Sequence, residues 1–188
     1  MDERVAGEQA GTGVPAELLG LMRGPDDGRG AVVEIHAAAG GIEAAYWAQM
    51  LARMYRRWAE RHGLRAELLD VVEGGEGGFA RATLEVGGAY AYGRLKAEDG
   101  VHRLVRVSPF DAAGRRHVSF ALVFVHPAQG DEPVPDRGDE PPGNQIRTYV
   151  FHPHRMVTDH RTDVRVEDVQ AVMDGGVDAF IEAYLRTA

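Results

Sequence analysis

The 188-residue sequence contains no cysteine, and Lys96 is its only lysine. Without cysteine the chain has no disulfide framework, no thiolate metal site and no thiol nucleophile. It also has no run of eighteen apolar residues, and its first residues, MDERVAGEQAGTG, lack the basic start and apolar stretch of a signal peptide. These absences predict a cytoplasmic protein that does not enter a membrane.

Positive charge is scarce as well. There are 29 acidic residues against 21 basic ones, which gives a formal net charge of -8 at pH 7. Indiscriminate nucleic-acid binding normally needs a basic surface that neutralises phosphates, so this function class is excluded, although a local basic patch is not. With 44% hydrophobic and 27% charged residues, the composition is that of an ordinary soluble domain with a sizeable core.

The order of hydrophobic patterns predicts an α+β fold with a β-rich core and packed helices. AVVEIHAA has strand character, and a long helix follows it, with four large apolar side chains on one face: Trp47, Leu51, Met54 and Trp58. RAELLDVV and FARATLEV predict a hairpin joined by EGGEGG, and VHRLVRVS, HVSFALVFVHP and QIRTYVF predict further strands. The C-terminal residues predict two helices that are interrupted at Gly175-Gly176.

Composition divides the chain into four segments. Residues 1–30 are rich in Gly, Pro and acids, and they predict a flexible leader with one short helix around residues 16–22. Residues 31–127 form the first part of the core. Residues 128–143 are acidic and Pro-rich, which predicts a linker, and residues 144–188 are expected to pack back on the core.

The Ser-Pro-Phe loop between two predicted strands carries the most distinctive chemistry. Ser108 can donate and accept a hydrogen bond, Pro109 stiffens the backbone, and Phe110 and His117 offer flat faces. Four arginines lie around them: Arg103, Arg106, Arg115 and Arg116. Flat faces with arginines suit single-stranded nucleic acid, where stacking contributes about 1–3 kcal/mol per base. From spacing alone, a solvated turn without function is an equally good interpretation.

Three long motifs carry a family resemblance: GGIEAAYWAQMLARMYRRWAERHG, AYAYGRLKAEDGVHRLVRVSPFDAAGRRHVSF and NQIRTYVFHPHRMVTDHRTDV. They resemble bacterial peptide chain release factors, and the Ser-Pro-Phe loop resembles the release factor 2 branch, which reads UGA and UAA. The resemblance covers about residues 31–127 and 144–188. It implies the family's codon-recognition superdomain, whose partners are the small-subunit decoding site of the ribosome and a stop codon in messenger RNA.

The resemblance also implies roles for individual residues. Gly40 and Glu43 match the start of the helix whose backbone reads the first uracil. Ser108, with Pro109 and Phe110, matches the segment that faces the second base, and His117 matches the imidazole that stacks on it. Arg115 and Val105 match neighbours of the third-base pocket, in which Val118 replaces a threonine that contacts the base. Val107 replaces a lysine, and Ala113-Gly114 replaces a Gly-Gly pair.

The family's catalytic domain has no counterpart here. Its Gly-Gly-Gln tripeptide is missing, because the five Gly-Gly pairs of the chain are never followed by Gln. The residues after them are Ile42, Glu76, Phe79, Ala89 and Val177. The predicted linker stands where the family inserts that domain. We therefore expect no peptidyl-tRNA hydrolysis by this chain alone.

Other candidate sites are weaker. His152, His154, Asp159 and His160 have a spacing that could bring ligands together, but they lie inside a family-like motif, so no metal site is expected. Asp159, Arg161 and Asp163 predict a polar turn with salt bridges. No phosphate loop, paired-carboxylate motif or nucleophile-base-acid arrangement stands out, so no cofactor is expected either.

These observations favour a non-catalytic release-factor-like protein that occupies the decoding site and modulates termination or protects ribosomes. Two alternatives stay open. Another chain could supply the Gly-Gly-Gln domain in trans, or the superdomain could have been recruited as an enzyme or small-molecule binder in specialised metabolism. The last alternative predicts that the Ser-Pro-Phe loop is closed over.

Overall fold

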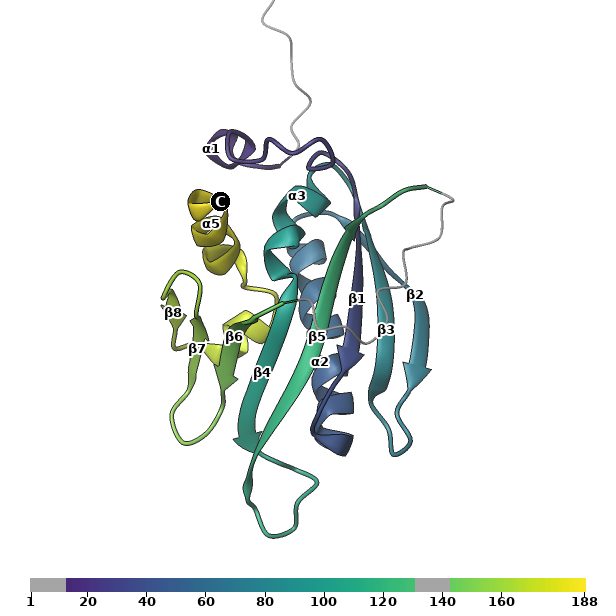
Figure 1. The fold of residues 1–188 in the computed structure, drawn as a ribbon, viewed down its shortest axis with the longest axis vertical. Coiled ribbons are helices and arrows are strands. Elements are labelled where there is room, and N and C mark those ends of the chain that lie inside the picture. The colour runs from purple at the N-terminus through teal and green to yellow at the C-terminus, as the bar shows by residue number, and fades with distance from the viewer. Residues whose placement is uncertain (1–12, 131–142) are drawn as a thin grey trace, which may run out of the picture.

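The computed structural model describes residues 13–130 and 143–188, which form an eight-stranded sheet with helix α2 packed across one face (Figure 1). The helices are α1 (Ala16–Leu19), α2 (Gly41–Arg61), α3 (Ala91–Leu95), the 3-10 helix η1 (Lys96–Glu98), α4 (Val169–Met173) and α5 (Asp178–Thr187). The strands are β1 (Ala31–Ala37), β2 (Arg65–Glu73), β3 (Phe79–Gly87), β4 (Gly100–Val107), β5 (Arg116–Pro127), β6 (Gln145–Val150), β7 (Met156–Asp159) and β8 (Arg165–Val166). The predicted α+β class is confirmed. No described helix is long and apolar enough to span a bilayer.

The sheet order, β2-β3-β1-β5-β4-β6-β7-β8, places β4 between β5 and β6. β2 and β3 form the predicted hairpin, and β4 and β5 also pair antiparallel. After residue 143 the chain continues as β6, which lies parallel to β4. The loop that joins β4 to β5 therefore projects from the end of a strand pair that is supported on both sides (Figure 1).

Helix α2 buries the face that its periodicity predicts. Four side chains on that face are fully shielded from solvent: Trp47, Leu51, Met54 and Trp58. The residue before the helix, Gly40, has φ of 133°, and a Cβ atom there would lie 2.8 Å from Ser119 Oγ on β5. Only glycine fits this position without strain. The start of α2 is thus seated directly against β5.

Residues 13–30 differ from the predicted flexible leader. They include three side chains in the hydrophobic core: Val14, Leu18 and Met22. Asp27 is also buried, and it accepts hydrogen bonds from Lys96 Nζ at 2.7 and 2.8 Å. These apolar residues are four positions apart, but Pro15 and Gly20 interrupt the stretch, which is too short for the sequence alone to reveal this packing. Residues 1–12 and 131–142, which belong to the predicted leader and linker, lie outside the described residues.

A buried polar network joins the C-terminal part to the core. Arg147 on β6 is fully buried and donates to Glu98 at 2.7 and 2.8 Å and to Asp159 Oδ2 at 3.1 Å. The Tyr55 hydroxyl donates to Glu98 Oε2 at 3.0 Å. The predicted polar turn with a salt bridge is present, since Arg161 pairs with Asp159 at 2.9 Å, but Asp159 itself is not on the surface. It is fully buried because the β6–β7 pairing places it opposite Arg147.

His102 belongs to the same network as a neutral imidazole. Its Nδ1 lies 2.9 Å from the Tyr149 hydroxyl, and its Nε2 lies 2.8 Å from the carbonyl oxygen of Glu98. The Tyr149 hydroxyl also accepts from Arg147 at 3.1 Å, so its hydrogen is free to donate to Nδ1 while Nε2–H donates to the carbonyl. Burial, reinforced by the Arg147 cation, lowers the pKa of His102 to about 4.

This low pKa predicts acid sensitivity. Because His102 stays neutral in the folded state while its unfolded counterpart takes up a proton below about pH 6.5, its contribution to stability falls as pH drops from about 6.5 to 4. The total is about 3 kcal/mol. His62 acts in the opposite direction, since its hydrogen bond to Asp178 raises its pKa. Urea unfolding at pH 7, 5.5 and 4.5 should show a smaller pH slope for His102→Gln than for wild type, and equal slopes would contradict this.

Candidate functional site

The Ser-Pro-Phe loop closes the β4–β5 hairpin, as predicted. Val107 at the end of β4 is opposite Arg116 at the start of β5. Within the loop, Ser108 N–H donates to the carbonyl of Arg115 at 3.3 Å, and Asp111 N–H donates to the carbonyl of Ser108 at 3.3 Å. The loop is therefore a hydrogen-bonded turn with a defined backbone.

One carboxylate ties this loop to the start of α2. Glu43, in the first turn of α2, accepts two hydrogen bonds from Arg106, at 2.9 and 3.0 Å, and one from the Ser108 hydroxyl at 2.9 Å. Its side chain is only 3% exposed. The two residues that the sequence places at the first and second bases, Glu43 and Ser108, are thus in direct contact. Arg106 completes the unit of Glu43, Arg106 and Ser108. Its place beside the loop in the sequence suggests contact with phosphate, but its guanidinium is bound to Glu43 instead.

The Ser108 hydroxyl is committed on two sides. It donates to Glu43, and it accepts from Phe110 N–H at 3.1 Å. Ser108 as a residue is 3% exposed, whereas Phe110 is 44% exposed and Pro109 is exposed too. A hydroxyl has two lone pairs, so one remains for an incoming donor. Phe110 and Pro109 therefore form the exposed surface of the loop. The Ser108 hydroxyl lies beneath them and is oriented by Glu43.

A second carboxylate organises the other side of the loop. Asp111 Oδ2 lies 2.8 Å from Arg115 Nε and 2.7 Å from His117 Nε2. The hydrogen bond from Arg115, followed by that from His117, holds the pKa of Asp111 well below its usual range. The sequence indicates Arg115 and His117 as candidates but not Asp111, the acid that contacts both of them. Asp111 fixes the imidazole, whose side chain remains 38% exposed.

The hairpin tip between β2 and β3 also reaches the site. The rings of Phe110 and Tyr46 lie 4.4 Å apart, centroid to centroid. A Cβ atom added to Gly77 would meet the Tyr46 hydroxyl at 2.6 Å, so the tip packs against this tyrosine. A hollow of about 260 Å³ separates the tip from the start of α2 near Gly41. The EGGEGG segment appears in the sequence only as a connector, because nothing in it indicates which helix it contacts.

The remaining candidates surround this centre. Gly40 is exposed at the start of α2, beside Ser119. Val105 is buried and pairs across the strands with Val118, which is 41% exposed. Val118 offers an apolar surface where the family has a hydroxyl. The structure thus gathers the predicted residues at one end of the sheet, in two groups organised by Glu43 and Asp111.

Two histidines of the FHPHRMVTDHRT segment, His152 and His160, take structural roles, and His154 is exposed. His160 Nε2 lies 2.7 Å from the Thr148 hydroxyl, and His152 Nδ1 accepts from Val107 N–H at 3.1 Å. Within residues 13–130 and 143–188, no three His, Asp or Glu side chains converge as metal ligands. His152 extends the β4–β6 ladder by one bond beyond its last backbone contact, Phe151 N–H to the Val105 carbonyl.

His152 should therefore steady the base of the loop. Replacing it with Phe removes the acceptor for Val107 N–H, and since one net hydrogen bond contributes about 1 kcal/mol, amide exchange at Val107 should become about fivefold faster. His152→Asn retains an acceptor and serves as the matched control. Hydrogen exchange followed by NMR measures both, and identical rates in the two variants and wild type would refute the role.

Three comparisons with known proteins agree on the family. The PCRF domain model matches residues 8–123. Peptide chain release factor 2 of Thermomicrobium roseum is 38% identical across 90% of this chain and 67% of its own length, and that of Thermotoga petrophila is 36% identical across 97% and 72%. The solved structure of RF2 of Thermus thermophilus superposes with a TM-score of 0.78 at 32% identity, covering 88% of this chain and 70% of that one.

The relatives are longer than this chain in a specific way. The alignment to the Thermomicrobium roseum protein spans 250 positions, more than the 188 residues of this chain. The relative therefore contains residues inside the aligned span that have no counterpart here. With the family model, the identities and the fold in agreement, the chain belongs to the peptide chain release factor family and is similar to release factor 2.

Proposed function

We propose that this protein binds the decoding site of the small ribosomal subunit, reads a stop codon there, and does not hydrolyse peptidyl-tRNA. Membership of the family supports a function related to translation termination. The observation that carries the proposal is the unit of Glu43, Arg106 and Ser108, which joins the start of α2 to the loop. Its minimal effect is competition with complete release factors for the same site, which modulates termination or protects the ribosome.

The geometry suits a strand of bases rather than an enclosed ligand. Phe110 and Val118 are 44% and 41% exposed, so the loop presents an open outer surface for stacking, with Ser108 covered beneath it. His117 is held at its edge by Asp111, which leaves a ring face available for stacking on a base. Phosphates can be met by Arg115, whose side chain is 75% exposed.

The Ser108 hydroxyl sets the chemistry at the second base. Its second lone pair is the acceptor for the amino group of adenine, and because Ser108 is only 3% exposed, the loop has to open over it for the base to reach this hydroxyl. Donation to guanine O6 requires its hydrogen to turn away from Glu43. One hydroxyl can thus pair with either purine. Its hydrogen is donated to guanine O6 or, when adenine is bound, to the Glu43 carboxylate.

The proposed function does not include hydrolysis of peptidyl-tRNA, because the sequence lacks the tripeptide that the family uses for it. None of the five Gly-Gly pairs is followed by Gln, and the relatives contain residues that this chain lacks. Without a group that reaches the ester of peptidyl-tRNA, the bound protein only occupies the site. Occupation without release is what makes competition the mechanism.

The experiment is sedimentation with ribosomes programmed with UAA, UGA or a sense codon, at low and physiological salt. Wild type should bind both stop-codon complexes more tightly than the sense-codon complex. Ser108→Ala should weaken stop-codon binding about tenfold, since one base contact contributes about 1–3 kcal/mol. Thr187→Ala removes an exposed hydroxyl at the far end of the chain and should change nothing. Failure to bind any of the three complexes at either salt concentration would eliminate the proposed function.

A further inference from the structure

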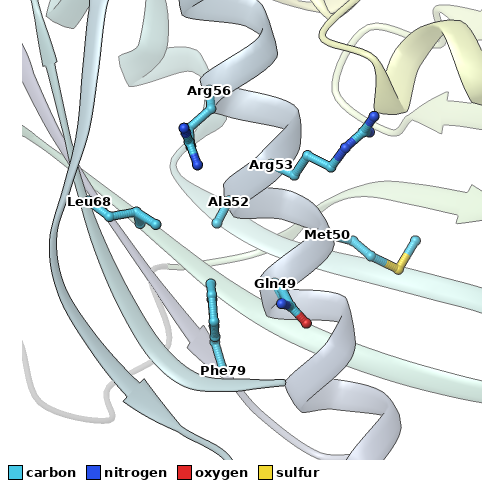
Figure 2. A pocket seen from close by; sticks show the side chains of 7 residues that line it. All are labelled: Gln49, Met50, Ala52, Arg53, Arg56, Leu68 and Phe79. Carbon is cyan, nitrogen blue, oxygen red and sulfur yellow. The ribbon is translucent and has the colours of Figure 1, made fainter. Parts of the chain in front are cut away.

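A second concave site lies between α2 and the β2–β3 hairpin. It has a volume of about 340 Å³ and shares no lining residue with the Ser-Pro-Phe loop. In Figure 2, Leu68 and Phe79 point from the two strands toward Ala52 on the helix, and Arg56 extends over the same space. We call the space bounded by these four residues and Gln49 the apolar groove.

The groove exists because β2 is the edge of the sheet. Helix α2 packs against β3, β5 and β1 and also reaches β2, but none of the side chains of β2 is fully buried. Leu68 and Phe79 are consequently half-buried, packed against the core on one side and open on the other. Ala52 has too short a side chain to fill the gap. The floor of the groove is therefore apolar and formed by rigid elements.

The charge at the rim of the groove is positive. Arg56 is exposed, and no carboxylate within the described ranges is in ion-pair distance of it. Arg53 also borders the groove, but it points to the opposite side of the helix (Figure 2), where it donates to Asp174 Oδ1 at 3.2 Å. No Asp or Glu lines the groove. In a chain with a net charge of -8, this is an unpaired cation above an apolar floor.

We propose that the apolar groove binds a small amphiphilic organic anion, with an aromatic or branched aliphatic body and one carboxylate. The body would lie on Leu68, Phe79 and Ala52, and the carboxylate would bind the guanidinium of Arg56 with the Gln49 amide beside it. An inorganic phosphate would leave the apolar floor exposed to water. A neutral apolar molecule would cover the Arg56 guanidinium without offering it a hydrogen-bond acceptor. A small acid uses both features, and the volume of the groove lies at the lower end of the range for ligand pockets.

The test compares two probes with the same body, 1-naphthylacetate and 2-(1-naphthyl)ethanol, titrated into the full chain and followed by backbone amide NMR. The carboxylate should bind about threefold more tightly than the alcohol, because Arg56 is exposed and an exposed ion pair contributes less than about 1 kcal/mol. Shifts should concentrate at Gln49, Ala52, Leu68 and Phe79. Arg56→Gln should abolish the preference for the acid.

Arg57→Gln is the matched control, since it removes the same charge one residue away from a side chain that is paired with Glu60 at 3.6 Å. It should keep the threefold preference of the wild type. Equal affinities of acid and alcohol for wild type would overturn the proposal. So would shifts centred on the exposed apolar residues of the loop, Val107, Phe110 and Val118, or equal effects of the two glutamine variants. No RNA is present in this test, so its result is independent of the proposed function.

Discussion

Replacing Arg147 with Met is expected to lower the free energy of unfolding by about 3–5 kcal/mol. Arg147, Glu98 and Asp159 are all fully buried. Removing the cation leaves Glu98 without its bidentate partner and Asp159 with Arg161 alone, in a low dielectric where a poorly paired charge is very unfavourable. The burial of Arg147 also holds the C-terminal part on the core, so the loss should affect the whole domain. Urea unfolding at pH 7 measures it.

The control is Arg53→Met, which removes an exposed arginine that is 51% accessible and paired with Asp174 at 3.2 Å. Its effect should stay below about 1 kcal/mol, as expected for surface ion pairs. A triple variant with Arg147→Met, Glu98→Leu and Asp159→Leu should recover part of the stability, since it removes the charges together. If Arg147→Met were no more destabilising than Arg53→Met, the network would not hold the C-terminal part in place.

Replacing Glu43 with Ala is expected to have the largest effect on function. It removes the acceptor shared by Arg106 and Ser108, whose three hydrogen bonds span 2.9–3.0 Å. Because Arg106 is 15% exposed and would lose its only ion pair among the described residues, the free energy of unfolding should fall by about 2–4 kcal/mol. Binding to stop-codon ribosomes should fall by about a hundredfold, since the loop loses its contact with α2.

Glu60→Ala, an exposed acid on the same helix, is the control and should alter stability by less than about 0.5 kcal/mol. The double variant Glu43→Leu with Arg106→Met separates stability from binding. It should restore much of the stability, because no charge remains buried, but it should not restore stop-codon binding. Recovery of both would mean that the unit supports the fold without orienting Ser108.

Much of the fold is visible in the sequence because its signals are local. The apolar stripe of α2 follows from helical spacing, and the β2–β3 hairpin follows from two alternating runs around EGGEGG. The leader was the exception. Residues 13–30 carry three buried apolar side chains at four-residue spacing, but the stretch is short and rich in glycine around it, and only the core shows where they pack.

The candidate site shows the same division. The Ser-Pro-Phe motif, the Gly40 entry to the helix and the absence of Gly-Gly-Gln are properties of short stretches of sequence. The role of Arg106 is not, since the same guanidinium beside the loop could face phosphate or a buried acid. Asp111 and Tyr46 were also missed, because neither stands out by type or spacing and each matters only through what it touches.

The sequence by itself thus determined the family, the apolar face of the long helix and the lack of a hydrolytic tripeptide, all of which are set by the order of neighbouring residues. Tertiary structure alone decided which charges meet. Glu43 and Arg106 are 63 residues apart in sequence, and Arg147 and Glu98 are 49 apart. Their pairing depends on which strands become neighbours, and burial then decides whether a charge is a solvated side chain or a structural contact.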